Sequence, residues 1–169
     1  MELQGQRVGL RPVEPGDAPV LRRIRETPEV VRWWGSPGPE FPEPDEPGDR
    51  RFVVLVGGQI AGFVQYWEEP DPEARHADVD VFLAPEHHGR GLGTNALRTL
   101  VRHLVEERGH HRITLSTDER NTRALRCYEK VGFRRVGVTR ASRWDDQTQQ
   151  WVDELLMDLV VSPAAPPAS

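Results

Sequence analysis

The sequence predicts an α/β protein of the α+β type, with one mixed sheet covered by helices on both faces. In the first half, β-rich runs at 52–56 and 60–67 are joined by Gly57-Gly58, a strong hairpin signal. In the second half, strand-like and helical segments alternate, which is typical of β–α–β units. Antiparallel hairpins followed by β–α–β units require a sheet with both kinds of pairing.

The first elements follow from caps and prolines. Residues 7–13 alternate apolar and polar side chains, which predicts a short strand. Asp17 is placed to cap a helix, and Thr27-Pro28 repeats the signal for a second helix. Five prolines between residues 36 and 49 exclude regular structure there. A loop of this length is expected to be either a functional lid or disordered.

The stretch from Asp78 to Gly93 organises the second half. It alternates like a strand, so that Asp78 and Asp80 share one face, and it turns at Pro85. A glycine-rich loop then leads into an amphipathic helix, and this geometry offers backbone N–H groups and a helix dipole to an anion. The alternative is that the glycines serve only a tight turn. The later predicted elements are a helix ending near Gly109, a strand at 112–117, a helix from Asn121 to Gly132, and strands at 133–138 and 152–160 around a bend at 144–151.

The chain length fits one domain, which we expect to span residues 1–161. Residues 162–169, rich in Pro and Ala, are expected to be disordered. No apolar run approaches the roughly 20 residues of a membrane span, and no signal peptide is recognisable. The single cysteine, Cys127, excludes an internal disulfide and favours a reducing cytoplasm.

The excess of acidic over basic residues limits the kinds of binding partner to expect. The chain has 22 Lys and Arg against 27 Asp and Glu, a formal net charge of −5. A general nucleic-acid binder needs a basic face, so we expect no nucleic-acid partner and no membrane partner. An acidic surface attracts cationic ligands, although it also serves solubility alone.

Two motifs together point to a known family. Single-residue glycine spacing without a following Lys-Ser or Lys-Thr excludes a Walker loop and fits a Rossmann fingerprint poorly. His88-Gly-Arg-Gly-Leu-Gly93 instead resembles the acyl-CoA pyrophosphate loop of the GCN5-related N-acetyltransferases, with His88 where that family usually has Gln or Arg. Asn121-Thr-Arg-Ala-Leu-Arg-Cys-Tyr-Glu-Lys-Val-Gly-Phe133 resembles the family's second cofactor motif at every defined position.

The resemblance implies the family's fold: a mixed, mostly antiparallel sheet of about six to seven strands, with acyl-CoA lying where two central strands splay apart. It implies acetyl-CoA as co-substrate and no metal. Tyr128 matches the residue that protonates or hydrogen-bonds the departing sulfur, and Cys127 is interpreted as buried packing. The residues implied in cofactor binding are Phe82, Leu83, Ala84, His88, Gly89, Arg90, Gly91, Leu92, Gly93, Thr94, Asn121, Ala124 and Tyr128.

Within the family the sequence is most similar to the aminoglycoside 6'-N-acetyltransferases. The local cues are Val31-Arg-Trp-Trp-Gly35, Thr117-Asp118 and the residues around Tyr128. By motif position, Asp80 and Asp118 match aspartates that contact the antibiotic in that branch. Asp80 is the preferred general base. Asp78, Trp33 and Trp34 complete the expected substrate-binding set, and the acids at 40–46 and 68–71 are expected to converge on the same cleft.

Other interpretations remain open at this stage. The scaffold also acetylates protein N-termini, polyamines and siderophore intermediates, because fold alone does not fix the substrate. A non-catalytic acyl-CoA-binding sensor is a different class, but an intact Tyr128 argues against it. The chain is expected to act as a monomer or homodimer.

Overall fold

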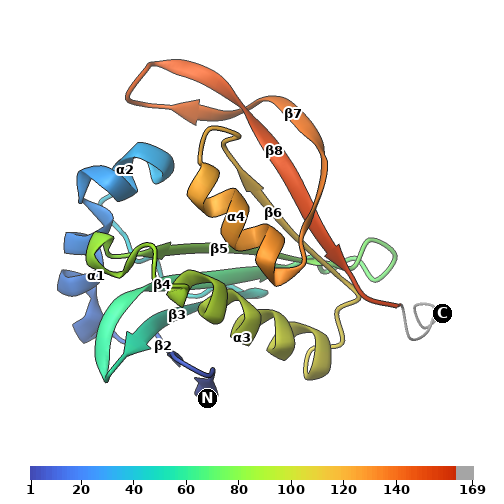
Figure 1. The fold of residues 1–169 in the computed structure, drawn as a ribbon, viewed down its shortest axis with the longest axis horizontal. Helices are drawn as coiled ribbons and strands as arrows, with labels where there is room; N and C mark the ends of the chain where they lie inside the picture. The colour runs from blue at the N-terminus through green and yellow to red at the C-terminus, as the bar shows by residue number, and fades with distance from the viewer. Residues whose placement is uncertain (163–169) are drawn as a thin grey trace.

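A computed structural model describes residues 1–162 (Figure 1). The expected disordered tail therefore lies, from residue 163 onward, outside the described residues. Within this range no helix has the length and apolarity needed to cross a membrane. The elements are β1 Leu3–Gln4, β2 Gly9–Pro12, α1 Ala18–Arg25, α2 Pro28–Trp34, β3 Asp49–Val56, β4 Gln59–Glu68, β5 Ala77–Leu83, α3 Leu92–Glu106, β6 Arg112–Thr117, α4 Thr122–Val131, β7 Arg134–Asp145 and β8 Gln150–Val160.

In the described chain, eight strands form one sheet in the order β1-β2-β3-β4-β5-β6-β8-β7. The strand beyond the expected six to seven is the two-residue β1, which pairs with β2 and is too short to leave a sequence pattern. Neighbouring strands are antiparallel except β5 and β6, which run parallel. Within residues 1–162 these two strands pair only at Ala77↔Ile113 and Asp78↔Thr114. Beyond that point β5 and β6 diverge, which is the splay expected between the central strands.

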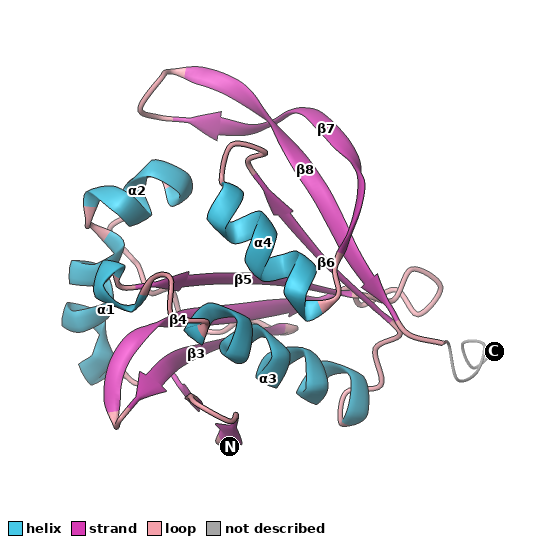
Figure 2. Ribbon diagram, in the orientation of Figure 1, coloured by secondary structure: helices cyan, strands magenta, loops and turns pink. Residues whose placement is uncertain are grey.

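Helices cover both faces of the sheet, as predicted, with α3 and α4 on one face and α1 and α2 on the other (Figure 2). Both faces need cover because successive side chains of β3 point to opposite faces and are apolar on each. Phe52 and Val54 pack into the α3 side of the core, and Val53 packs into the α1 side. On β5, Val79 belongs to the α3 side and Phe82 to the α1 side. Asp80 shares the parity of Phe82 and therefore faces α1 and α2.

The first part of the proline-rich loop is ordered, which contradicts the expectation of disorder there. Phe41 is buried and packs against Phe63 and Phe82, with ring centroids 5.6 and 6.2 Å away. From α1, Arg22 donates to the carbonyl oxygens of Gly38, Pro39 and Phe41 at 2.8–3.0 Å. The sequence pattern missed this anchoring because its partners are distant along the chain. The first part of the loop is a packed connection on the α1 face.

The last hairpin is longer than expected. The bend was predicted at 144–151, but β7 and β8 continue through Trp144 and Trp151, which pair across the hairpin. Their rings meet edge to face at 5.6 Å, a cross-strand contact that stabilises the extension. The hairpin tip thereby reaches the end of α2, where Gln147 Nε2 donates to the Val31 carbonyl at 2.7 Å. In Figure 1 the hairpin lies above both α2 and α4.

Candidate active site

A cavity of about 780 Å³ opens where β5 and β6 part. Its walls come from α2, β5, the start of α3, the end of β6, α4 and the β7–β8 hairpin. The predicted residues that line it are Trp33, Trp34, Asp80, Phe82, Leu83, His88, Gly89, Gly91, Leu92, Gly93, Thr94, Asp118, Asn121, Ala124 and Tyr128. Three predicted residues, Asp78, Ala84 and Arg90, do not line it.

The glycine loop forms a cradle of backbone N–H groups at one end of the cavity. Gly89 and Gly91 have φ of +72° and +73°, a left-handed conformation that suits glycine. Gly91 is the N-cap of α3, so the first amides of this 15-residue helix have no acceptor within the helix. Free amides and a helix N-terminus together favour an anion such as a phosphate.

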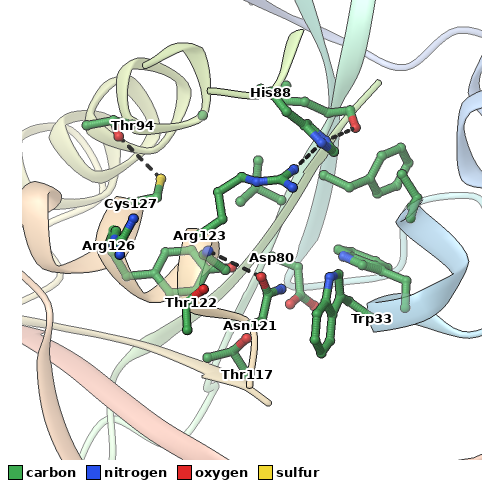
Figure 3. Close-up of a pocket in the computed structure, with 18 of the residues that line it drawn as sticks. Trp33, Asp80, His88, Thr94, Thr117, Asn121, Thr122, Arg123, Arg126 and Cys127 are labelled. Carbon is green, nitrogen blue, oxygen red and sulfur yellow. Dashed lines mark hydrogen bonds between the residues drawn. The ribbon is translucent and has the colours of Figure 1, made fainter. Parts of the chain in front are cut away.

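His88 connects this loop to β5 and α4. Its Nε2 lies 2.9 Å from the Leu83 carbonyl oxygen, and its Nδ1 contacts Nη1 of Arg123 (Figure 3). Since a guanidinium only donates, Nδ1 is assigned as the acceptor and Nε2 as the protonated nitrogen. Burial lowers the pKa of His88, which favours this neutral form. His88 thus holds Arg123 against the loop.

Sequence reasoning missed Arg123, Arg126 and Lys130, which line the cavity from α4. Their spacing of three and four residues places them on one helix face, which is a signal that the sequence contains. Arg90, the cation expected at the loop, instead points its Nη1 toward His87 Nδ1, 3.4 Å away. The positive charge along the cavity therefore comes mostly from α4, with Arg143 added from β7.

Asn121 and Cys127 have simple local partners. The Asn121 side-chain oxygen accepts from the Ala124 amide at 3.3 Å, which makes it the N-cap of α4. The Cys127 thiol accepts from Thr94 Oγ1 at 3.4 Å and so links α4 to α3. Burial raises the pKa of this thiol, which disfavours a reactive thiolate.

Asp80 and Tyr128 form the titratable pair of the cavity. Burial is the main cause that raises the pKa of Asp80 to about 7, and the negative charge of Asp78 adds to it. Gln65 Nε2, which donates to Asp80 Oδ2 at 3.3 Å, works in the opposite direction. Burial and the Asp80 charge raise the pKa of Tyr128. Near neutral pH the site therefore holds a carboxyl group close to its midpoint and a protonated phenol.

The two tryptophans form the α2 wall. Trp34 meets Phe82 edge to face with ring centroids 5.0 Å apart, so it joins the core on the α1 side. Trp33 has the Arg32 guanidinium stacked on its ring at 4.5 Å. Asp80 lies between the Trp33 indole and Asn121 (Figure 3).

The expected convergence of acids on the cavity is mostly wrong. Asp78 does not reach it, because its Oδ1 accepts from Thr114 Oγ1 at 2.7 Å where β5 and β6 still pair. In the described residues, none of the acids at 40–46 or 68–71 lines the cavity. Glu68 instead faces another cavity, of about 310 Å³, and binds Arg108 and His110 at 2.8 Å each.

Two further carboxylates at the cavity, Asp118 and Glu154, are paired with arginines, whereas the exposed Glu29 on α2 makes no salt bridge within the described residues. Asp118 accepts from Nη2 of Arg120 at 2.6 Å, and this hydrogen bond lowers the pKa of Asp118. Glu154, which the sequence did not reveal, lies 3.8 Å from Arg143 Nε on the neighbouring strand. Paired carboxylates attract a cation less than free ones, and Glu29 is exposed to solvent, so Asp80 is the partly buried carboxyl group of this site without an arginine partner.

Comparisons with a family model, with relatives and with a solved structure all match acetyltransferases. Residues 18–133 match the model of the "Acetyltransferase (GNAT) family". The chain is 29% identical over 141 residues to spermidine N(1)-acetyltransferase of Escherichia coli K12, covering 75% of this chain and 72% of that protein. It is 29% identical over 154 residues to aminoglycoside N(6')-acetyltransferase type 1 of Klebsiella pneumoniae, covering 78% and 76%. A solved structure of aminoglycoside acetyltransferase AAC(6')-Ib with coenzyme A superposes with a TM-score of 0.75 at 25% identity, covering 90% and 94%.

Proposed function

Since this chain belongs to the acetyltransferase (GNAT) family and is an acetyl-CoA-dependent N-acetyltransferase of amines, we propose that its acceptor is an aminoglycoside and that it acetylates the 6'-amine. One observation supports catalysis in this cavity: Asp80, a carboxyl group with a pKa near 7, lines the same cavity as Tyr128. General acid–base catalysis works best with groups that titrate near the working pH.

The cavity fits acetyl-CoA. The amides at the start of α3 and the Arg123 side chain suit the pyrophosphate, and Arg126 and Lys130 add positive charge beside it. The backbone of β5 beyond Asp78 has lost its β6 partner and is free to pair with an amide-bearing arm. Bound acetyl-CoA supplies the acetyl group as an activated thioester.

The protein side of the reaction then needs two proton movements. Asp80 accepts the proton of the acceptor ammonium, directly or through water, and leaves a neutral amine able to attack. Tyr128 holds its phenolic proton throughout the physiological range and can donate it to the departing sulfur. The two groups sit in one cavity, and the negative charge on Asp80 makes ionisation of Tyr128 less favourable.

An aminoglycoside is supported by the shape of the acceptor end and by the similarity to Klebsiella pneumoniae aminoglycoside N(6')-acetyltransferase type 1. Trp33 offers a flat aromatic wall beside Asp80, and such a wall suits the face of a sugar ring. Asp80 supplies the carboxylate next to the reacting amine, while Asp118 and Glu154 sit further round the same cavity. We place the reaction in the cytoplasm, where the Cys127 thiol at the cofactor cavity stays reduced.

A polyamine is the second candidate, because the spermidine N(1)-acetyltransferase of Escherichia coli aligns over a similar share of the chain. A linear polyamine needs one carboxylate at the reacting nitrogen and others along its length. Here Asp118 and Glu154 already bind arginines, which weakens their attraction for a polyamine and for an aminoglycoside alike, so the Trp33 wall beside Asp80 is the feature that favours the sugar.

A thiol-release assay with kanamycin-like amines, polyamines and short peptides, run side by side with acetyl-CoA, tests the proposal. We expect the highest kcat/KM for an aminoglycoside with a free 6'-amine and little turnover when that amine is blocked. Preference for spermidine or a peptide would overturn the aminoglycoside assignment. Saturable binding of acetyl-CoA without turnover of any amine would identify a sensor instead of an enzyme.

A further inference from the structure

Arg25 is a buried cation beside the acceptor end of the cavity. It lies on α1 and is 6% exposed. Its hydrogen-bond acceptors are backbone oxygens: Nη2 donates to Trp34 at 2.8 Å, and Nη1 donates to Gly35. Its buried Nε has no hydrogen-bond partner within residues 1–162. Burying a cation without a paired anion is costly, so this position must provide a compensating benefit.

Arg25 hydrogen-bonds to the backbone at the C-terminal end of α2. The last carbonyls of a helix have no partner within the helix and need one from elsewhere. Arg25 binds the carbonyl oxygens of Trp34, the last helical residue, and of Gly35, the C-cap. The Val31 oxygen, which already accepts from the Gly35 amide, also accepts from Gln147 of the hairpin tip at 2.7 Å. A helix of seven residues is too short to be stable alone, so these contacts fix its position.

The guanidinium also fixes the side chains of the wall. Its carbon lies 5.1 Å from the ring centre of Trp34 and 5.8 Å from that of Phe41, in cation–π geometry. Trp34 in turn meets Phe82, two residues beyond Asp80 on β5. A continuous set of contacts therefore runs from Arg25 through Trp34 to the strand that carries Asp80.

The charge of Arg25 acts through space on three acids, first on Glu43 and Asp146 and then on Asp80. The other groups that face Asp80 come from four elements: Asp78 on β5, Gln65 on β4, Glu154 on β8 and Tyr128 on α4. The acids among them disfavour the carboxylate form, whereas the Arg25 cation favours it.

We propose that Arg25 is a positioning residue for the acceptor: it holds the Trp33–Trp34 wall beside the site and places a positive charge near Asp80. The inference rests on the proposed function, because it concerns the same acceptor site, but it does not depend on which amine is acetylated.

The test compares Arg25→Met, Arg25→Lys and the control Arg23→Met, an exposed arginine on the same helix. For Arg25→Met we expect the KM of the amine to rise at least tenfold, while the KM of acetyl-CoA stays within twofold. The midpoint of the pH dependence of kcat/KM should rise, since a cation near Asp80 is lost. Arg25→Lys keeps the charge but not the forked donor, so its midpoint should stay while its amine KM rises.

A merely structural role would lower stability and raise both KM values together without moving the pH midpoint, and that result would overturn the inference. So would an unchanged amine KM in a folded Arg25→Met protein. If Arg25→Met does not fold, Arg25→Lys is used instead: a higher amine KM with an unchanged acetyl-CoA KM supports the inference, and an equal rise in both contradicts it. Hydrogen exchange of residues 28–35, expected to be faster in the Arg25 variants than in Arg23→Met, gives an answer even if the wild type acetylates none of the amines offered. That absence of turnover would contradict the proposed function, and unchanged exchange of residues 28–35 in the Arg25 variants would then overturn the role of Arg25 in holding α2.

Discussion

Replacing Asp80 by asparagine should remove activity and stabilise the fold at the same time. The pKa of Asp80 rises from an ordinary 3.8 to about 7 in the folded protein. A difference of about 3 pH units corresponds to roughly 4 kcal/mol between the folded and unfolded states. Because the folded state favours the protonated acid, wild-type stability is fully present below the unfolded pKa and is lost as the pH rises toward 7.

The Asp80→Asn variant has no charge to bury at this position, so it should escape this loss. At pH 8 we expect the substitution to raise the free energy of unfolding by up to about 4 kcal/mol. The gain should shrink by about 1.4 kcal/mol for each pH unit below 7 and nearly vanish near pH 4. In kinetics, kcat/KM should fall by roughly two to four orders of magnitude, and the rising limb of the pH profile near 7 should disappear.

Urea unfolding at pH 5 and pH 8, with Glu106→Gln as an exposed-carboxylate control, measures the stability difference. The pH dependence of kcat/KM measures the catalytic part. A stability difference that is the same at both pH values would refute the burial of an ionisable Asp80. Wild-type kcat/KM across the pH range would refute Asp80 as the base.

Four further predictions concern single contacts. Tyr128→Phe should lower kcat by about tenfold or more, while the affinity for acetyl-CoA stays within a few-fold of wild type. Steady-state rates measure kcat and isothermal titration measures the affinity; an unchanged kcat would exclude Tyr128 as the acid. Asp78→Asn removes a negative charge beside Asp80, so the kinetic midpoint should move to lower pH, opposite to Arg25→Met. Arg123→Ala should raise the KM of acetyl-CoA several-fold and leave that of the amine unchanged; the reverse pattern would assign Arg123 to the acceptor. The hydrogen bond from Arg108 lowers the pKa of Glu68 to about 2, so the ionised carboxylate stabilises the fold above pH 4.5 and this contribution is lost toward pH 2. In urea titrations, Glu68→Gln should therefore cost about 1–3 kcal/mol of unfolding free energy at pH 7 and almost nothing near pH 2.

Much of the fold was predictable because its signals are local. The alternation at 78–83, the glycines that follow it and the cap at Asn121 each act within a few residues, and the structure contains the strand, loop and helix that they predict. The glycine-loop end of the cavity was predictable for the same reason, because the residues that line it there, His88, Gly89 and 91–94, lie in one short segment of the chain.

The acceptor end was predicted less well because pairing between distant charges decides it. Alternation places Asp78 and Asp80 on one face, but only the point where β5 and β6 part makes Asp80 accessible to the cavity and leaves Asp78 bound to Thr114. The role of Arg25 likewise depends on backbone oxygens of Trp34 and Gly35, about ten residues away, which carry no sequence signature. Composition counts such charges without showing which of them are neutralised.

The early end of pairing between β5 and β6 gives this protein an edge in the interior of its sheet. Edge strands usually lie at the sides of a sheet, where unpaired backbone groups are open to any passing strand. Here the unpaired part of β5 lies inside a cavity, and His88 already takes the Leu83 oxygen. Because α2, α4 and the β7–β8 hairpin surround this backbone, it is less open to pairing with a strand of another molecule than an ordinary sheet edge. The fold thus contains unpaired backbone without presenting it at the outer edge of the sheet.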